Sequence, residues 1–376
     1  MRVAIVHDWL PFMGGAENVI INMHEVFPEA PIYTSMCNRM NMRGALRDAD
    51  IRTTFLQKTD KKMLNHRRLF PYMPTAMESI DLRGYDVVIS SSTSVGKSVI
   101  TGPDTLHICY CNTPMRYAWE QRHNYIGPLV GKGGFKNRMI SYFMTFMRVW
   151  DYATSARVDV FVGNSVNVAK RIRKYYRRDA YVIHCPVRTA MFHTTKEDGG
   201  FFLCVSRLQE YKGIELAVKV CSDNNLPLYV IGTGPMKEKL EAMAGPTVKF
   251  LGFVDDDELK DYYARCKALI FPGVEDFGIT PLEAQASGRP VIALGKGGIL
   301  ETVIENETGV FFDEPTPNSL LEAIRRFESM TFDKEKIRAH ALEFDESVFK
   351  DRLKRFVEEQ YRIFKEKQME GITVYK

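Results

Sequence analysis

The 376-residue sequence lacks a long apolar run, a regular cysteine framework and a strong excess of charge of either sign. No stretch approaches the roughly 18 apolar residues that a membrane-spanning helix needs. The apolar start of the chain is too short for a signal peptide and predicts a first β-strand over residues 3–6. A net charge of +4 is too small to indicate a nucleic-acid partner. These features favour a cytoplasmic protein, either soluble or peripheral on the cytoplasmic face of a membrane.

The seven cysteines are odd in number and irregularly spaced. Cys109 and Cys111 share one face of a predicted strand, and Cys204 lies in another. Because no second cysteine pair or histidine cluster accompanies them, the pattern favours buried thiols over a metal site. It also indicates a reducing compartment.

Two ligand-binding patterns are missing as well. No Gly-x-Gly-x-x-Gly is followed by an acidic residue at the next strand, which disfavours a dinucleotide oxidoreductase. No Asp-x-Asp lies in a turn suited to a metal ion, and the acidic run at residues 255–257 has the pattern of a helix N-cap. We therefore expect no metal and no other cofactor.

The chain is long enough for two domains, and its 45% hydrophobic and 26% charged residues are typical of globular proteins. Strands, Gly-rich turns and helices alternate along both halves, which predicts doubly wound α/β domains. The predicted strands cover residues 3–6, 87–89, 106–111, 158–162, 202–206, 228–231, 248–251, 269–271, 290–294 and 309–312. Ser165 is the predicted N-cap of a helix over residues 166–175. Polar residues 194–200 are the predicted linker, and the apolar spacing from Val348 onward predicts an amphipathic terminal helix.

Two glutamates in the second half bracket a turn that leads into a helix. Residues 268–271 form a buried strand, after which Glu275 and Glu283 stand on either side of the predicted helix start. The N–H groups of residues 278–280, at the positive end of the helix dipole, would hold a phosphate. Glu275 and Glu283 would accept hydrogen bonds from sugar hydroxyls, although two solvated glutamates beside an ordinary loop would give the same spacing.

Cations follow the strand at residues 202–206. Arg207 and Lys212 stand at its carboxyl end, where open α/β sheets bind ligands, and two cations there suit a diphosphate.

In the first half, Gly14 and Gly15 follow the first strand and precede a predicted helix. The two glycines would let the backbone approach an anion closely, although a tight turn without a ligand would show the same pair.

Five blocks occur together in one order, and together they resemble family 4 of the retaining glycosyltransferases. They are Ser206-Arg207-Leu208 with Tyr211-Lys212-Gly213, Gly232-Thr233-Gly234-Pro235, Phe250-Leu251-Gly252-Phe253-Val254, the segment from Glu275 to Glu283, and Gly297-Gly298. Gly14-Gly15-Ala16-Glu17 and residues 107–119 match more loosely, the latter resembling a block of the mannosyltransferase-like branch.

The resemblance implies a GT-B fold, with two Rossmann-like doubly wound domains facing a central cleft. The acceptor-binding domain would cover residues 1–190 and be joined by the terminal helix at 350–376, and the nucleotide-sugar domain would cover 191–349. The resemblance gives Arg207, Lys212 and Glu275 catalytic roles at the departing diphosphate and the donor sugar. Donor-binding residues would be Gly15, Phe253, Phe277, Gly278, Ile279, Thr280 and Glu283, with Glu283 on the ribose and Phe253 beside the nucleobase.

The acceptor side departs from the family pattern at one position. The mannosyltransferase-like branch usually has His-Thr-Pro where this chain has Asn112-Thr113-Pro114. Asn112 cannot act as a base at neutral pH, but the leaving diphosphate can take the acceptor's proton if attack occurs on the same face. His107 is expected to be a strand residue rather than a replacement base. Arg116 and Trp119 are further candidates for the acceptor cleft, for phosphate or carboxylate binding and for stacking on a sugar.

A basic and apolar segment offers a contact with the inner membrane surface, where a lipid-linked acceptor would lie. It contains Lys58, Lys61, Lys62, Arg67 and Arg68 among Leu64, Leu69, Phe70, Tyr72 and Met73, and a solvated loop or helix face would have the same composition.

The sequence thus predicts a hexosyltransferase, specifically a retaining mannosyltransferase that uses GDP-mannose. Its acceptor would be a saccharide or lipid-linked molecule of surface polysaccharide, lipopolysaccharide or glycolipid synthesis. A UDP-sugar-dependent enzyme of the same family and a non-catalytic nucleotide-sugar-binding subunit remain as alternatives. A sugar epimerase or a phosphorylase would share the fold, but nothing identifies the lysine that would hold pyridoxal phosphate in a phosphorylase.

Overall fold

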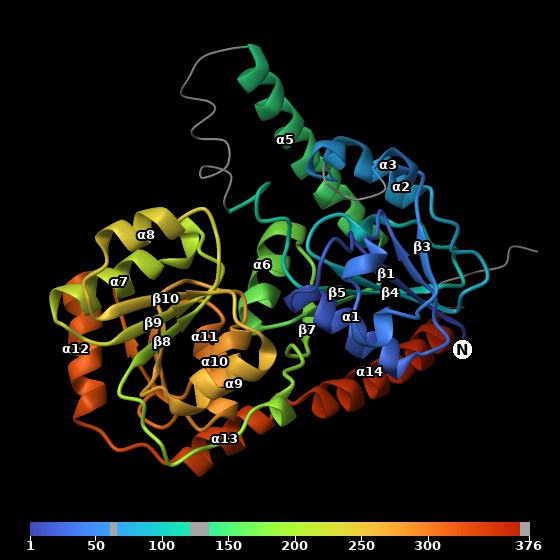
Figure 1. The fold of residues 1–376 in the computed structure, drawn as a ribbon. Coiled ribbons are helices and arrows are strands. Elements are labelled where there is room, and N and C mark those ends of the chain that lie inside the picture. Colours follow the sequence, from blue (N-terminus) through green and yellow to red (C-terminus); the bar gives the residue numbers. More distant parts are fainter. Residues whose placement is uncertain (61–65, 121–134, 369–376) are drawn as a thin grey trace, which may run out of the picture. The chain divides into compact units, whose positions relative to one another are not determined.

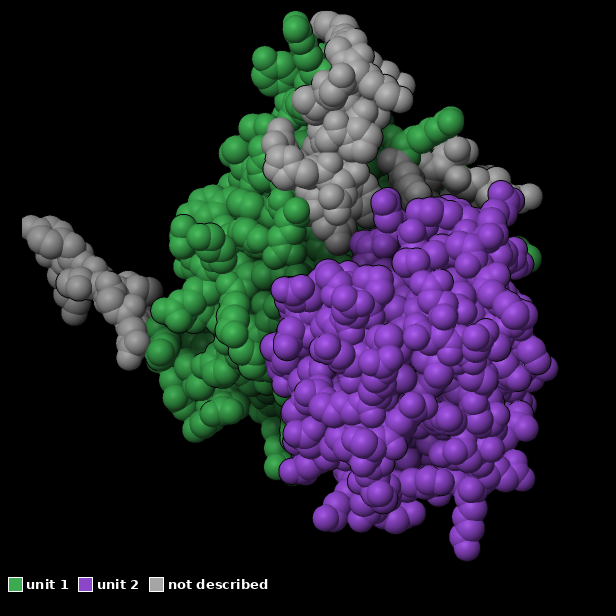
Figure 2. Space-filling view, turned by 90° about the vertical axis from the view of Figure 1, so that its left-hand side faces the viewer, with its two compact units in different colours: residues 1–184, 349–376 green, residues 185–348 purple. Residues whose placement is uncertain are grey.

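The computed structural model describes residues 1–60, 66–120 and 135–368, and its elements are labelled in Figure 1. The chain forms two compact units, shown in different colours in Figure 2. Unit 1 contains residues 1–184 and 349–376, and unit 2 contains residues 185–348.

Unit 1 is built on a seven-stranded parallel sheet with the order β3-β2-β1-β4-β5-β6-β7. Its strands are β1 (Val3–His7), β2 (Ile32–Thr34), β3 (Ile51–Thr53), β4 (Val87–Ser92), β5 (Leu106–Cys111), β6 (Val160–Gly163) and β7 (Ala180–Val182). Its helices are α1 (Gly15–Val26), α2 (Leu56–Thr59), α3 (Met73–Glu78), α5 (Phe135–Thr154), α6 (Val166–Tyr176) and most of α14 (Glu346–Lys367). Short 3-10 turns cover Arg39–Asn41, Gly44–Leu46, His66–Tyr72, Gly96–Ser98 and Ser155–Arg157.

Unit 2 contains a six-stranded parallel sheet with the order β10-β9-β8-β11-β12-β13. Its strands are β8 (Phe202–Val205), β9 (Leu228–Ile231), β10 (Val248–Gly252), β11 (Leu269–Phe271), β12 (Val291–Leu294) and β13 (Gly309–Phe312). Its helices are α7 (Ile214–Asp223), α8 (Lys237–Met243), α9 (Asp256–Arg265), α10 (Ile279–Ala286), α11 (Ile299–Thr302), α12 (Pro317–Glu328) and α13 (Lys334–Leu342). Two further 3-10 turns cover Thr189–Met191 and Glu210–Lys212.

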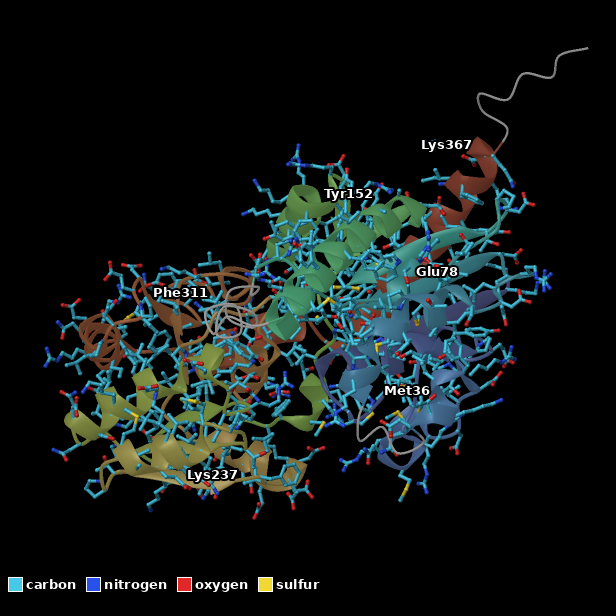
Figure 3. All side chains as sticks on the ribbon, turned by 90° about the horizontal axis from the view of Figure 1, so that it is seen from above. Met36, Glu78, Tyr152, Lys237, Phe311 and Lys367 are labelled. Carbon is cyan, nitrogen blue, oxygen red and sulfur yellow. The ribbon has the colours of Figure 1, made fainter. Side chains whose placement is uncertain are left out.

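The central strands are buried on both faces, as parallel strands covered by helices should be. Every residue of β1, β4 and β5 is buried, and so is every residue of β11 and β12. One part of the core of unit 1 extends from β1 and β4 to Met36, labelled in Figure 3, and to the inner side of α5. The prediction of two doubly wound α/β units is confirmed.

Most predicted elements lie within one or two residues of the observed ones. Ser165 caps α6 as predicted, because its hydroxyl accepts a hydrogen bond from the Val168 N–H at 3.1 Å. Strands β2, β3 and β7, of which β3 and β7 form the edges of the sheet, were not predicted. Each has three residues that are not all buried, unlike the fully buried β11, so no apolar run marks them in the sequence.

The units divide at other residues than the sequence indicated. The division falls after His184 rather than after residue 190, because Val187 pairs with the segment before α14. The Val187 N–H donates to the Phe344 carbonyl at 3.0 Å, and the Glu346 N–H donates to the Val187 carbonyl at 3.0 Å.

The polar stretch at residues 194–200 is part of unit 2 and not the linker. The Arg289 guanidinium donates to the Glu197 carbonyl at 2.5 Å, and the Gly199 N–H donates to the Arg265 carbonyl at 2.8 Å. A buried arginine therefore fastens this stretch to the helices of unit 2.

The terminal helix α14 belongs to unit 1 from Phe349 onward. Phe349 packs edge-on against Tyr110 of β5, with 5.8 Å between ring centroids, and Lys350 pairs with Glu25 at 2.8 Å. Apolar side chains at helical spacing, Phe349, Leu353 and Val357, are the buried ones, so the predicted amphipathic helix is confirmed.

A buried ion pair ties α5 to the 3-10 turn Gly96–Ser98, which follows β4. Lys97 pairs with Asp151, and both side chains are almost fully buried. Asp151 also accepts hydrogen bonds from the Trp119 indole at 2.8 Å and from the Tyr176 hydroxyl at 2.9 Å. Because both oxygens of the Asp151 carboxylate accept hydrogen bonds and Lys97 balances its charge, the carboxylate is tolerated in the core.

Candidate functional site

The strand order of unit 2 changes direction between β8 and β11, which are neighbours in the sheet although β9 and β10 separate them in sequence. In a doubly wound sheet the loops after such strands diverge and leave a crevice at their carboxyl ends. Arg207 and Lys212 follow β8, and Glu275 and Glu283 follow β11. The predicted diphosphate and sugar contacts thus come from the two loops at this switch point.

The loop after β11 turns sharply into α10. Gly278 adopts φ 104°, a conformation that side chains rarely tolerate, and α10 begins at the next residue. Pro281 stands in the first turn, as predicted, and contributes no N–H, so Ile279 and Thr280 supply the N–H groups of that turn. A helix start of this kind favours an anion through its dipole.

Two glycines hold the acidic loop in place from the side of β12. Gly297 forms a parallel bridge with Glu275, and the Gly298 N–H donates to the Glu275 carbonyl at 2.9 Å. A Cβ on Gly298 would collide with the Asp276 carbonyl oxygen, and one on Gly297 would lie 2.6 Å from the Glu275 carbonyl oxygen. Only glycine allows this approach, which fixes the backbone that presents Glu275.

The loops after β8 and β11 also touch each other directly. A Cβ on Gly273 would lie 2.8 Å from the Lys212 carbonyl oxygen, and Gly213 adopts φ 67° beside Pro272. Across this contact the Lys212 ammonium pairs with the Glu275 carboxylate, and the two side chains are only 16% and 19% exposed. The structure therefore brings two of the three predicted catalytic residues into direct contact.

Arg207 and Phe253 are more exposed than Lys212 and Glu275. Arg207 is exposed, and no side chain in the described ranges forms an ion pair with its guanidinium. Phe253 follows β10 and is 81% exposed. Phe277, in contrast, is buried and its ring packs against Phe344, so that only its backbone could meet a ligand.

Glu283 lies one turn into α10 and is half-buried. The hydroxyl of buried Tyr263, on α9, donates to its carboxylate at 2.8 Å. Burial raises the pKa of Glu283, and the Tyr263 hydrogen bond opposes that rise. Tyr263 was not predicted as a site residue. In the sequence it is one more apolar position of the predicted helix, four residues after Leu259, and nothing in that pattern indicates a contact with Glu283.

The glycines of Gly232-Thr233-Gly234 form the packed turn that the sequence predicted. A side chain on Gly232 would collide with the Ser206 carbonyl, and one on Gly234 with the Leu208 carbonyl. The Leu208 N–H donates to the Thr233 carbonyl at 2.9 Å, which joins this turn to the loop that carries Arg207.

Unit 1 has its own switch point, between β1 and β4. Asp8, at the end of β1, is buried and accepts hydrogen bonds from the Thr93 N–H at 2.6 Å and the Gly96 N–H at 2.5 Å. This carboxylate, missed by the sequence reasoning, fixes the loop after β4. Gly14 precedes α1 without a side-chain cap, and Gly15 is the first residue of the helix.

The three predicted acceptor residues follow β5. Asn112 is buried, and its side-chain amide donates to the Ser91 hydroxyl at 2.9 Å, while its backbone carbonyl accepts from the Asn164 side-chain amide at 2.9 Å. Trp119 gives its N–H to Asp151 and stacks on Tyr175, with 4.8 Å between centroids. Arg116 is half-buried in the turn between them. The structure thus gives Asn112 and Trp119 scaffold contacts besides any acceptor contact.

Three expectations about titratable residues are confirmed. His107 lies in β5, where burial lowers its pKa to about 4 and Ser90 contacts its Nε2 at 2.8 Å, so it is a strand residue. Asp255 caps α9, accepting from the Asp257 and Glu258 N–H groups. All seven cysteines are buried, and none forms a disulfide bond. Within the described ranges, no three His, Cys, Asp or Glu side chains gather as a metal site.

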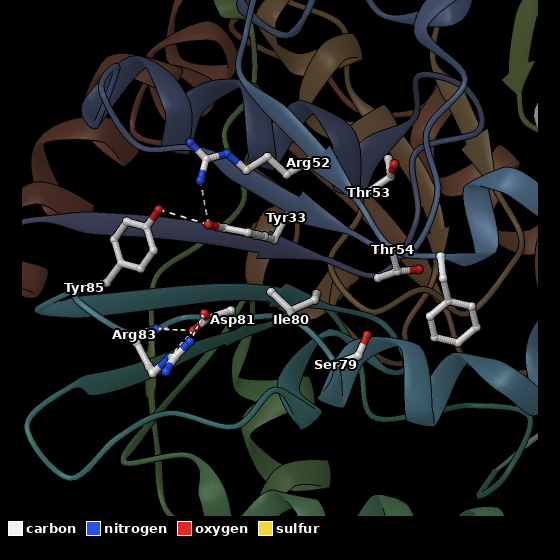
Figure 4. Close-up of a pocket in the computed structure, with 10 residues that line it drawn as sticks. Tyr33, Arg52, Thr53, Thr54, Ser79, Ile80, Asp81, Arg83 and Tyr85 are labelled. Carbon is white, nitrogen blue, oxygen red and sulfur yellow. Dashed lines mark hydrogen bonds and ion pairs between the residues drawn. The ribbon is translucent and has the colours of Figure 1, made fainter.

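A cavity of about 590 Å³ lies in unit 1 on the side of β2 and β3 (Figure 4). Arg52 donates to the Tyr33 hydroxyl at 2.9 Å, and that hydroxyl lies 3.1 Å from the Tyr85 hydroxyl. Arg83 pairs with Asp81 at 2.6 Å. Arg52 also pairs with Asp50 at 2.7 Å, so each guanidinium has a carboxylate partner, and none of the predicted site residues lines this cavity.

Residues 188–343 match the family model described as glycosyl transferases group 1. Over 141 residues the chain is 33% identical to an uncharacterized glycosyltransferase of Methanocaldococcus jannaschii, an alignment of 35% of this chain and 36% of the relative. It is also 33% identical, over 140 residues, to a GDP-mannose-dependent alpha-(1-6)-phosphatidylinositol monomannoside mannosyltransferase of Mycobacterium tuberculosis, covering 32% of this chain and 36% of the relative. The chain thus spans about a third of the length of these relatives.

The fold of the whole chain is similar to that of sucrose-phosphate synthase from Thermosynechococcus elongatus. The TM-score is 0.70 at 16% identity, and the superposition covers 96% of this chain and 100% of the other. The GT-B fold predicted from the sequence is confirmed, and the glycosyltransferase resemblance is confirmed over unit 2. The roles of the single site residues stay predictions.

Proposed function

We propose that this chain, whose residues 188–343 belong to the group 1 glycosyl transferases, is a retaining glycosyltransferase that uses GDP-mannose. The observation that carries the proposal is the contact between Lys212 and Glu275 beside the start of α10. It supports the proposal because a cation, a carboxylate and a helix amino terminus together match the diphosphate and the sugar hydroxyls of one donor molecule.

The reaction breaks the bond between C1 of the donor sugar and the diphosphate oxygen. The acceptor hydroxyl attacks C1 on the same face, a new C1–O bond forms, and the acceptor's proton passes to the departing diphosphate. Negative charge therefore grows on the diphosphate, and fixed cations with a helix dipole stabilise that charge. Arg207, Lys212 and the N–H groups of Ile279 and Thr280 supply this stabilisation, so the step needs no metal ion.

The two glutamates have separate tasks in this proposal. Glu275 exchanges its contact with Lys212 for the hydroxyls of the sugar when the diphosphate engages the lysine. Glu283 accepts hydrogen bonds from the ribose, and Tyr263 holds its carboxylate in one orientation. Phe253, which is exposed after β10, offers its backbone to the nucleobase.

Mannose and a lipid-linked acceptor are supported by the M. tuberculosis relative, whose name includes GDP-mannose and a phosphatidylinositol mannoside. Surface polysaccharide, lipopolysaccharide or glycolipid synthesis is the corresponding cellular role. Asn112 replaces the histidine expected on the acceptor side, and we propose that this change affects acceptor choice and not bond cleavage.

The first test is a thermal-shift screen of the purified protein with GDP, UDP and ADP and their sugar conjugates, with and without EDTA. Stabilisation by GDP and GDP-mannose that EDTA does not reduce supports the donor and the metal-independent site. Stabilisation by UDP-sugars instead would keep the enzyme class and overturn mannose. Loss of the shift with EDTA would overturn metal independence.

Two variants test the residues themselves. Arg207→Ala and Glu283→Ala should each weaken donor use strongly, whereas Arg325→Ala and Glu322→Ala, on exposed positions of α12, should leave it unchanged. Product analysis separates the other classes, because an epimerase would change the nucleotide sugar without an acceptor. Nucleotide binding with no transfer to any acceptor would favour the binding-subunit alternative.

A further inference from the structure

The cavity beside β2 and β3 has the size of a ligand site, although none of the predicted functional residues lines it. Its volume of about 590 Å³ falls within the range of small-molecule pockets, about 300–1,000 Å³. Tyr33 of β2 and Arg52 of β3 are register partners, so their side chains stand on the same face of the sheet. Residues from the stretch 79–85, which leads into β4, complete the lining (Figure 4).

The inner part of this lining is fixed to the core of unit 1. Tyr33, Ile80 and Tyr85 are half-buried and pack against the core cluster that includes residues of β1 and β4. The rings of Tyr33 and Tyr85 meet edge-on, with 6.1 Å between centroids, and the Arg52 guanidinium lies 5.5 Å from the centre of the Tyr33 ring. A wall formed in advance lowers the ordering cost of binding a ligand.

The charges around the cavity balance one another. Arg52 pairs with Asp50 at 2.7 Å, and Arg83 pairs with Asp81 at 2.6 Å. An anionic ligand would therefore have to compete with a carboxylate for either guanidinium. The lining favours a ligand that is polar but carries no net charge.

The basic segment that the sequence offered for a membrane contact begins three residues after Phe55. Lys58 and Arg68 are exposed, and neither lines the cavity. Its members Lys61, Lys62, Leu64 and the side chain of Arg67 lie outside the described residues, so the membrane contact stays a prediction. The described part of this segment adds no charge to the cavity lining.

The two tyrosine hydroxyls leave one donor unused. Arg52 donates to the Tyr33 hydroxyl at 2.9 Å, and the hydroxyl oxygens of Tyr33 and Tyr85 lie 3.1 Å apart. Only one of these hydroxyls can donate to the other, so the second hydrogen has no acceptor among the described residues. Burial raises the pKa of Tyr85, which keeps its proton at neutral pH. A ligand oxygen can accept the unused hydrogen, and the Asp81 carboxylate can accept from a ligand hydroxyl.

Phe55 adds an aromatic surface to these polar groups. It lines the cavity from the turn between β3 and α2 and is 50% exposed. The face of an aromatic ring is negative and attracts the positively polarised C–H groups on the flat side of a sugar ring. The hydroxyls around the rim of the same sugar match the donors and acceptors of the lining. This combination fits a sugar better than a purely apolar ligand.

The cavity is separate from the predicted acceptor residues of unit 1. The sheet order places β3 four strand spacings from β5, which is about 19 Å and more than one sugar residue spans. Asn112 follows the carboxyl end of β5, whereas residues 79–85 precede the amino end of β4. One sugar that contacts Asn112 cannot also fill the cavity.

We propose that this cavity binds a neutral saccharide, as a second saccharide site on unit 1. The inference rests on the proposed function in one respect, because the bound saccharide is the part of the acceptor that lies away from the hydroxyl receiving the new sugar. The acceptor is then a chain of several sugar residues, held by the cavity at one position and glycosylated at another.

The test follows isoleucine methyl signals by NMR in the full-length protein while a linear α-linked mannotriose is added. Ile80 lines the cavity, and Ile100, which is 51% exposed elsewhere in unit 1, is the reference. The Ile80 signal should shift and saturate, and the Ile100 signal should stay in place. No shift of Ile80 with mannotriose, or with the corresponding glucose and galactose trisaccharides, would overturn the proposal.

Two variants test the side chains. Phe55→Ala should weaken mannotriose binding at least about fivefold, because the aromatic surface is gone. Tyr33→Phe should weaken it about tenfold, because the hydroxyl that orders the donors is lost. Phe146→Ala, which removes a 57% exposed ring from α5, is the matched control and should bind like the wild type. Equal affinity of the wild type and Phe55→Ala would refute the site even if Tyr33→Phe folds poorly, because Phe55 is exposed.

Inorganic phosphate separates a saccharide from an anion. At the same concentrations phosphate should leave the Ile80 signal unchanged, because both guanidinium groups have carboxylate partners. Phosphate that shifts Ile80 more tightly than mannotriose does, with the shift lost in Arg52→Gln, would assign the cavity to an anion and overturn the proposal.

Nucleotide binding separates this proposal from the proposed function. Thermal shifts with GDP, measured without saccharide, should be the same for the wild type, Phe55→Ala and Tyr33→Phe. A saturable Ile80 shift without any nucleotide shift would sink the proposed function and leave the saccharide site standing. A GDP shift without any response of Ile80 to the trisaccharides would do the opposite.

Discussion

The Tyr263 hydroxyl donates a 2.8 Å hydrogen bond to Oε2 of Glu283, and so links the inside of α9 to the residue proposed to bind ribose. Tyr263 is fully buried, and its ring packs edge-on against Phe192. A rigid aromatic donor thereby fixes the rotamer of a carboxylate that faces partly into solvent. The orientation of Glu283 is built into the core and does not depend on the donor.

Tyr263→Phe should lower the free energy of unfolding by about 1.5–3 kcal/mol at neutral pH, because a hydrogen bond to a charged group is lost. The pKa of Glu283 is raised by burial in the folded protein, and the lost hydrogen bond should raise it further. A carboxyl group whose pKa is higher in the folded protein than in the unfolded chain lowers the free energy of unfolding at neutral pH. This cost disappears once the pH is below the pKa of the group in the unfolded chain, because the carboxyl is then protonated in both states. Urea unfolding at pH 7 and near pH 4 checks the sign, and Tyr262→Phe is the neighbouring control.

Lys212→Met should reduce kcat about 10²–10³-fold, because the growing charge on the diphosphate loses a fixed cation. The variant also leaves Glu275 without its ion-pair partner in a site where both side chains are mostly buried. Steady-state kinetics with GDP-mannose, with Lys219→Met on exposed α7 as the control, measures the effect. Equal kcat values in the two variants would remove Lys212 from the proposed mechanism.

The elements around the donor site could be predicted because their signals are local. An apolar run, Pro272-Gly273 and Pro281 lie within thirteen residues of one another and mark the end of β11 and the start of α10. The partners of those residues could not be predicted in this way. Tyr263, Asp8 and the Lys97–Asp151 pair act through contacts between segments far apart in sequence, and no periodicity reveals such contacts.

The predicted linker failed for a related reason. Residues 194–200 are polar and contain two glycines, which is the composition of a linker. Composition does not show that Arg289, nearly a hundred positions later, donates to two carbonyls of this stretch. The division after His184 is set instead by backbone pairing of Val187 with the segment before α14.

Lys97→Met should destabilise unit 1 by about 3–5 kcal/mol, because it leaves the Asp151 carboxylate buried without its cation. The double variant Lys97→Met, Asp151→Asn should recover part of this loss, because the buried charge is gone while Trp119 and Tyr176 keep an acceptor. Urea unfolding of the wild type, Lys97→Met, Asp151→Asn and the double variant gives the coupling energy between the two side chains. Strict additivity of the single effects would mean that the pair does not hold α5.

Gly298→Ala should abolish donor binding with a smaller effect on the core of unit 2. The added Cβ would collide with the Asp276 carbonyl oxygen, so the loop that presents Glu275 and begins α10 must move. Gly102→Ala is the matched control, because a Cβ there meets nothing within 4 Å. Calorimetric titration with GDP measures the loss, and urea unfolding shows whether the fold is kept. Normal GDP affinity in Gly298→Ala would mean that the acidic loop does not position the donor.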